Sequence, residues 1–109
     1  MNTDLLRQAR DGLPRRLNCG ILMGDGGFCV LGWLLIAAGF HPITLYANTL
    51  GVVEPGQGGP AIDVVARVYG LPRDDVEGLA RLNDTTPSAD RTAAVRARLD
   101  ELLDGADAP

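Results

Sequence analysis

The sequence predicts a mostly α-helical fold, a small single domain packed around a central buried helix at about residues 28–39. Three observations lead to this prediction. Apolar residues recur at helical spacing in several short segments, the segment from Phe28 to Ala38 is apolar on every side of a helical wheel, and glycine or proline separates one segment from the next. Because the chain has 109 residues, we expect one domain over residues 1–104 and a frayed tail at residues 105–109.

The first predicted helix is short and amphipathic. Asn2 or Thr3 supplies the capping side chain at its start, and Gly12 with Pro14 marks its end. Its inward face carries three apolar residues, Leu5, Leu6 and Ala9.

A short β-hairpin is compatible with residues 17–28, directly before the central helix. Residues 17–23 lack helical periodicity, and the following Gly24-Asp25-Gly26-Gly27 suits the positive φ angles of a tight turn. At the other end of the central helix, Gly39 stands where a left-handed residue commonly terminates a helix.

The middle of the chain predicts two helices separated by a loop. Pro42 can open a helix that ends at Gly51, and residues 54–60 read Glu-Pro-Gly-Gln-Gly-Gly-Pro, which predicts a loop. The next helix covers Ala61 to Tyr69, and Gly70 closes it.

Two further helices complete the prediction. One begins at Leu71-Pro72-Arg73 and stops at Asn83-Asp84. The other is capped by Ser88, and we expect Arg96 and Asp100 to pair across one turn of it. The apolar stripe of this last helix consists of Val95, Leu99, Leu102 and Leu103.

Charge argues against nucleic acid as the partner. The formal net charge is −4, all ten basic residues are arginine, and aromatic residues make up only 5% of the chain. Such a surface repels phosphate backbones, and the adjacent pair Arg15 and Arg16 is too small to overcome it. The arginines of the later helices alternate with acidic residues, as on a solvated helix face. They stand at positions 67, 73, 81, 91, 96 and 98. A protein partner with a basic surface fits this charge better.

We expect a reduced cytoplasmic protein that does not enter membranes. The chain contains Cys19 and Cys29 but shows no basic start followed by an apolar run, which is the pattern of export signals. The most apolar run, Phe28 to Phe40, is too short to span a bilayer.

A resemblance to a group of small uncharacterised bacterial and phage proteins is carried by two sequence boxes. The first is Gly26-Gly27-Phe28-Cys29-Val30-Leu31-Gly32-Trp33-Leu34-Leu35, with its Cys-x-x-Gly helix start, and the second is the late Leu82-Asn83-Asp84 before a terminal amphipathic helix. The resemblance spans roughly residues 20–104 and implies a fold rather than an activity. It marks a structural motif of Cys29, Gly32, Trp33, Asn83 and Asp84.

Each residue of this motif has a structural interpretation. Cys29 and Gly32, both small and one turn apart, would form a notch for close packing, and Trp33 would anchor the core or a protein interface. Asn83 and Asp84 suit a helix end, where their side chains can bind backbone groups.

The alternative is a cysteine-dependent hydrolase or transferase. Cys29, His41 and Asn83 occur in the order that papain-like enzymes use, and the helix dipole would lower the thiol pKa near a helix start. However, His41 follows the helix that Cys29 begins, which separates them by roughly 18 Å at 1.5 Å per residue. We therefore predict no catalytic residues, and the sequence favours a non-enzymatic protein.

No cofactor or metal is predicted. His41 is the only histidine, and neither it nor Cys19 and Cys29 show the paired spacing of zinc ligands. The glycine-rich turn lacks the Lys-Ser/Thr of a phosphate-binding loop. Acidic residues at 63, 74, 75 and 77 are explained by their places at helix starts.

The function predicted from these features is that of a small acidic accessory protein acting through protein–protein contacts. One concrete form is a phage-encoded inhibitor of a host defence complex, as anti-CRISPR proteins are. The cysteine-dependent enzyme using Cys29 is the first alternative, and a helical DNA-binding regulator is the second.

Overall fold

The computed structural model describes residues 1–18, 23–24, 27–40 and 61–107. In chain order the described elements are α1 (Thr3–Asp11), β1 (Met23–Gly24), β2 (Gly27–Phe28), α2 (Val30–Ala37), α4 (Ala61–Tyr69), α5 (Arg73–Thr85) and α6 (Arg91–Asp107). The predicted mostly helical fold is therefore confirmed. The predicted helix from Pro42 to Gly51, the loop at 54–60, Cys19 and His41 lie outside the described residues.

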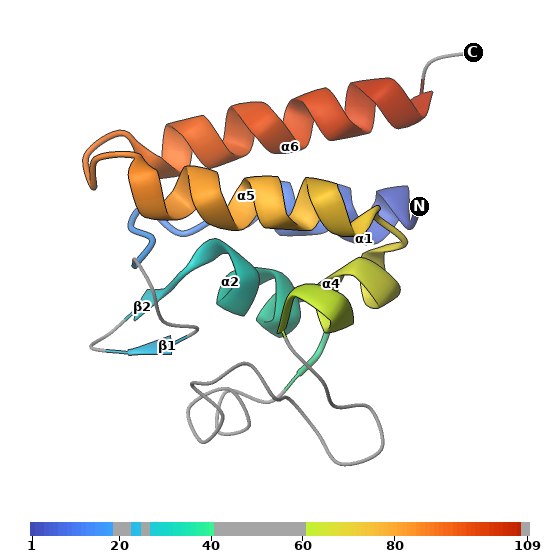
Figure 1. Ribbon diagram of the computed structural model, residues 1–109, viewed down its shortest axis with the longest axis horizontal. Helices are drawn as coiled ribbons and strands as arrows, with labels where there is room; N and C mark the ends of the chain where they lie inside the picture. The colour runs from blue at the N-terminus through green and yellow to red at the C-terminus, as the bar shows by residue number, and fades with distance from the viewer. Residues whose placement is uncertain (19–22, 25–26, 41–60, 108–109) are drawn as a thin grey trace.

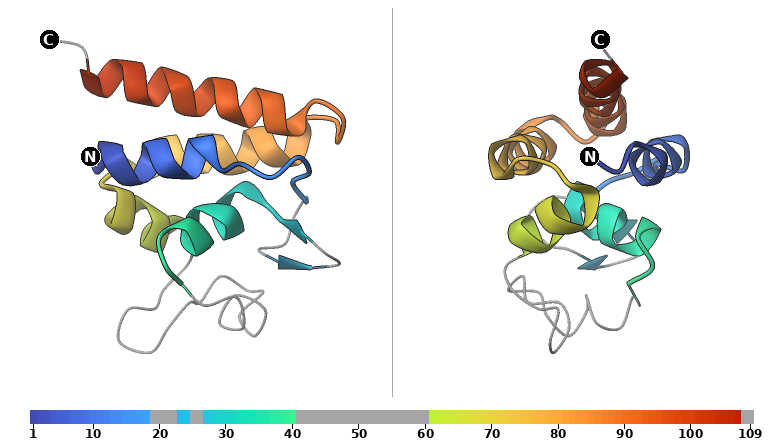
Figure 2. Two further views of the ribbon diagram at one scale, coloured as in Figure 1. Left: turned by 180° about the vertical axis from the view of Figure 1, so that it is seen from behind. Right: turned by 90° about the vertical axis from the view of Figure 1, so that its right-hand side faces the viewer.

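The helices pack in three tiers, with α1 and α5 between α6 on one side and α2 and α4 on the other (Figure 1 and Figure 2). Figure 1 shows α5 and α6 running antiparallel beside each other, and Figure 2 shows α6 lying over α1 and α5, with α2 and α4 on the opposite side. Helix α2, which the sequence predicts to be central, contacts α1, α4 and α5, and α1 and α5 each contact three helices as well. Among the described helices, none combines the length and the apolar character that a membrane crossing requires.

The core is aliphatic, and every described helix contributes to it. Helix α2 supplies Leu34 and Leu35, whose side chains are fully buried. The Tyr69 hydroxyl of α4 donates a hydrogen bond of 2.5 Å to the Leu34 carbonyl oxygen, which joins α4 to α2 in the interior. The largest fully buried side chains are Tyr69, Leu6, Leu34, Leu35, Leu79, Leu99, Val30, Val64, Val65 and Val76.

Helix α1 has the boundaries that its sequence predicts. The Asn2 side chain accepts a hydrogen bond from the Leu5 N–H at 3.2 Å, and Gly12 is the C-cap. The Asn2 N–H in turn donates to the Tyr69 carbonyl oxygen at 2.8 Å, which attaches the start of α1 to the end of α4.

Two of the glycines predicted to end helices have positive φ, whereas Gly12 at the end of α1 has φ of −93°. Gly39 has φ of 99° after α2, and Gly70 has φ of 67° after α4. The residue that follows each glycine donates back into the helix, Phe40 to the Leu35 carbonyl and Leu71 to the Ala66 carbonyl. This is the hydrogen bond of a Schellman motif, which explains why glycine is needed at these two positions.

The predicted hairpin is present and leads directly into α2. Met23 pairs with Phe28 and Gly24 with Gly27 in antiparallel register, and the Asn18 N–H donates to the Phe28 carbonyl at 2.7 Å. Helix α2 begins at Val30 rather than Phe28, because the hairpin holds Phe28 in extended pairing.

Three predicted details of the last two helices are wrong. Helix α5 continues through Asn83 and Asp84 to Thr85, so these residues lie inside the last turn. Helix α6 begins at Arg91 instead of being capped by Ser88, since residues 88–90 form a turn in which the Asp90 N–H donates to the Pro87 carbonyl. It ends at Asp107.

The third error concerns the expected pair between Arg96 and Asp100. The Asp100 carboxylate instead accepts from Arg10 of α1 at 2.9 Å. This contact joins α6 to α1, so a charge that the sequence assigned to a local helix pair serves a tertiary contact.

Candidate functional site

The start of α2 carries the residue with the most reactive chemistry, Cys29. Its backbone is extended, with φ of −76° and ψ of 175°, and its Sγ atom accepts a hydrogen bond from the Gly32 N–H at 3.5 Å. Cys29 is therefore the N-cap of α2, with a sulfur atom in the place where serine or aspartate normally offers an oxygen. The side chain is buried.

Asn83 provides a second cap for the same helix end. Its Oδ1 atom accepts from the Val30 N–H at 3.1 Å, and its Nδ2 group donates to the Asn18 carbonyl oxygen at 2.7 Å. Nδ2 also lies 3.0 Å from the Asp84 carboxylate. Because both ends of the amide are bonded and the side chain is only 1% exposed, Asn83 connects α5, α2 and the segment before the hairpin.

Electrostatics keep the Cys29 thiol protonated. Burial is the largest influence and raises the pKa of Cys29, and the nearby Asp84 carboxylate raises it further. Backbone N–H groups at the helix start act in the opposite direction but do not reverse the shift. The expected lowering of the thiol pKa by the helix dipole is therefore wrong, because desolvation of the thiolate outweighs it.

The structure brings together two of the three residues of the papain-like alternative. Asn83 bonds the residue that directly follows Cys29, while His41 lies outside the described residues. In papain-like sites the asparagine amide orients the imidazole. Here both Asn83 groups are bound to backbone atoms and to Asp84, which supports a structural role.

The two boxes of the structural motif meet in space at this point. Cys29 and Gly32 come from the first box, Asn83 and Asp84 from the second, and the Val30 N–H joins them. Gly32 is buried, as a close-packing residue should be. The prediction that Asn83 binds backbone groups is correct, but the groups belong to distant segments rather than to its own helix end.

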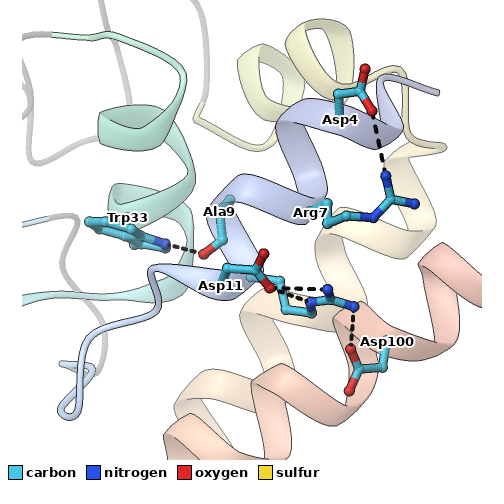
Figure 3. Close-up of polar contacts among 7 residues, drawn as sticks. Asp4, Arg7, Ala9, Asp11, Trp33 and Asp100 are labelled. Carbon is cyan, nitrogen blue, oxygen red and sulfur yellow. Dashed lines mark hydrogen bonds and ion pairs between the residues drawn. The ribbon is translucent and has the colours of Figure 1, made fainter.

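Trp33 lies on the side of α2 that faces α1. Its indole Nε1 donates to the Ala9 carbonyl at 2.8 Å, as Figure 3 shows, and its ring lies 6.4 Å from the Phe28 ring between centroids. A Cβ added at Gly12 would lie 3.1 Å from the Trp33 ring. The side chain is half-buried, so Trp33 anchors the contact between α1 and α2 and reaches the surface.

Sequence reasoning missed one buried charge, Arg91. Only 9% of it is exposed, its Nη1 group donates to the Leu17 carbonyl at 2.7 Å, and its Nε group donates to the Thr86 carbonyl at 3.3 Å. The sequence did contain a signal for this burial, because Arg91 stands four residues before Val95 and so continues the buried stripe of α6.

The three arginines of α6, expected on a solvated helix face, have different surroundings. Arg91 is buried and Arg96 is exposed, whereas Arg98 lies within 3.5 Å of Asp75 and 2.8 Å of Glu101. On α5, Arg73 is likewise paired, with Asp63 and Glu77. Within the described residues, no group of His, Cys, Asp and Glu side chains could hold a metal ion.

The start of α1, the start of α5 and the end of α6 lie at one end of the bundle (Figure 1). These segments carry the exposed residues Asp4, Asp74 and Asp104, which we call the acidic end, and Asp4 is paired there with Arg7 at 3.5 Å. The segment at residues 14–18 lies at the opposite end, where the Thr92 hydroxyl of α6 donates to the carbonyls of Pro14 and Arg15. Between these ends, Arg10 pairs with Asp11 at 3.0 Å and with Asp100 at 2.9 Å, and Figure 3 shows the two carboxylates.

The comparisons with known proteins add no relative. No protein-family model matches the chain, and no match was found among curated proteins or among solved structures.

Proposed function

We propose that this chain is a small, non-enzymatic accessory protein that acts through contacts with another protein. The observation that carries the proposal is the acidic end. Asp4, Asp74 and Asp104 come from three different helices that the fold places together, and each of them is exposed. A surface of this kind favours a partner with a basic patch, and its charge accelerates association with such a partner.

The chemistry around Cys29 supports the same proposal. A nucleophilic cysteine needs an accessible thiolate and a base within hydrogen-bond distance. The Cys29 thiol is buried, its pKa is raised, and its sulfur caps α2. The group with the highest intrinsic reactivity among the described residues is thus used to build the fold.

The contact surface is polar rather than apolar. Among the described residues, Met1 is the only large hydrophobic side chain that is exposed, at 48%. Recognition would therefore depend on charge and hydrogen bonding more than on an apolar anchor, which predicts a strong dependence of affinity on salt. We propose a cytoplasmic location and a bacterial or phage origin, with a phage-encoded inhibitor of a host defence complex as one concrete form.

A binding experiment with two matched double variants tests the proposal. The acidic-end variant, Asp74→Asn with Asp104→Asn, removes two charges from the acidic end. The matched variant, Asp84→Asn with Asp90→Asn, removes two charges at the end of α5 and just before α6, at the opposite end of the bundle. Immobilised wild-type protein should capture a partner from bacterial lysate. The acidic-end variant should lose that partner, and the matched variant should keep it.

Two results would contradict the proposal. One is capture of no protein above background by the wild type at low salt. The other is equal loss of the captured protein by both double variants, because that result would show a response to net charge rather than to the acidic end. Circular dichroism of each variant establishes that it is folded.

A further inference from the structure

The second charged region of the molecule is positive, although the chain as a whole is acidic. Arg15 and Arg16 are exposed, and neither is paired with a carboxylate in the described part of the chain. Their backbone lies against the start of α6, because Thr92 bonds the Arg15 carbonyl at 3.1 Å and Arg91 bonds the Leu17 carbonyl at 2.7 Å. We call Arg15, Arg16 and Arg91 the arginine end.

Arg91 makes this region different from a pair of surface arginines. The residue is nine-tenths buried, and both hydrogen bonds of its guanidinium go to neutral carbonyl oxygens rather than to a carboxylate. A charge taken out of water is costly unless an opposite charge compensates it. The positive charge of Arg91 is therefore held at the arginine end without a counter-ion among the described residues.

One nitrogen of the Arg91 guanidinium has no hydrogen bond within the described residues. The Nε and Nη1 groups are bonded, but Nη2 is not. No fully enclosed polar side-chain atom of the described residues lacks a hydrogen-bond partner, so Nη2 is not fully enclosed. It belongs to the residue whose Nη1 bonds Leu17, directly after the exposed Arg15 and Arg16.

We propose that the arginine end binds a phosphate group, either free phosphate or a phosphate monoester. Guanidinium groups match phosphate oxygens in paired hydrogen bonds, and clusters of arginine are a common means of recognising phosphorylated residues. A long nucleic-acid backbone fits less well, because the exposed Asp90 directly precedes Arg91 and the chain carries a net charge of −4. The site takes one compact dianion.

The test is an NMR titration of the ¹⁵N-labelled full chain at constant ionic strength, with inorganic phosphate in one arm and O-phospho-L-serine in the other. Saturable shifts are expected at Arg15, Arg16 and Arg91. Arg16→Gln should weaken binding about fivefold, and Arg96→Gln, the same change at an exposed arginine further along α6, should alter it less than about twofold. Asp90→Asn should tighten it, because a nearby negative charge is removed.

The two arms separate the sources of the phosphate. Tighter binding of phosphoserine indicates a phosphorylated protein residue, and equal binding indicates free phosphate. Linear shifts that do not saturate, equal weakening by Arg16→Gln and Arg96→Gln, or tighter binding of duplex DNA than of either phosphate would overturn the proposal. Because exposed Arg16 is the variant tested, the result does not depend on a fold that tolerates loss of Arg91. The proposal also does not rest on the acidic end, so failure to find a basic partner leaves it standing.

Discussion

The Asn83 side chain accepts a hydrogen bond from the Val30 N–H at 3.1 Å, although 53 residues separate the two in the sequence. A helix start has backbone N–H groups without partners in its own helix, and they are normally capped from nearby in the chain. In this fold the cap for α2 comes partly from α5. The same amide holds the Asn18 carbonyl, so one side chain fixes three segments.

Replacing this amide should be costly. Asn83→Ala removes the cap of the buried Val30 N–H and one hydrogen bond to the Asn18 carbonyl, so we expect a loss of about 3 kcal/mol in the free energy of unfolding. Urea denaturation measures this loss of stability. Asn2→Ala, the same change at an exposed helix cap, should cost about 1 kcal/mol. Equal costs for both variants would show that the Asn83 bonds do not stabilise the fold.

Two glycines should respond to alanine in opposite directions. At Gly70, φ is 67° and an added Cβ would lie 3.0 Å from Met1 Cα, so Gly70→Ala should destabilise the protein by about 1–2 kcal/mol. At Gly78, inside α5, an added Cβ meets nothing within 4 Å, so Gly78→Ala should stabilise it by about 0.5–1 kcal/mol. Thermal denaturation of the two variants compares them directly, and a stabilising Gly70→Ala would contradict this backbone geometry.

Tyr69 should make stability depend on alkaline pH. Burial raises the pKa of its hydroxyl above the ordinary value of about 10, so the folded state keeps the proton that the unfolded state releases. This contribution is present below the unfolded pKa and is lost as the pH rises above it. In a Tyr46→Phe background, the tyrosinate absorbance should then appear only together with unfolding.

The matched variant of this experiment is Tyr69→Phe. It removes the hydrogen bond to Leu34 and should cost about 1 kcal/mol at neutral pH, while flattening the decline of stability at alkaline pH. Reversible titration of Tyr69 at its ordinary pKa in the folded protein would disagree with its burial.

The helices could be predicted from sequence because their signals are local. Apolar spacing identified the inward faces of α1 and α4, and Gly39 and Gly70 marked helix ends through their own backbone preference. The role of Asn83 could not be predicted in the same way, because its partners Val30 and Asn18 are distant in sequence. The late start of α6 depends on the turn after Pro87, which competes with Ser88 as a cap.

The candidate site was predicted in its residues but not in its chemistry. Asn83 does bond the residue that follows Cys29, yet the sequence pointed to a lowered thiol pKa, since it showed the helix start and not the depth of burial. Arg91 was taken for a surface residue because arginine is rarely buried, although it continues the apolar stripe of α6.

Thiol labelling tests most directly whether Cys29 is a structural residue. In a Cys19→Ser background, the folded protein should react with a thiol reagent at neutral pH far more slowly than the same chain unfolded in urea, because burial shields the sulfur and raises its pKa. The rate should increase on unfolding. Labelling of the folded protein that is faster than labelling of the unfolded chain would show an activated thiolate and contradict the account.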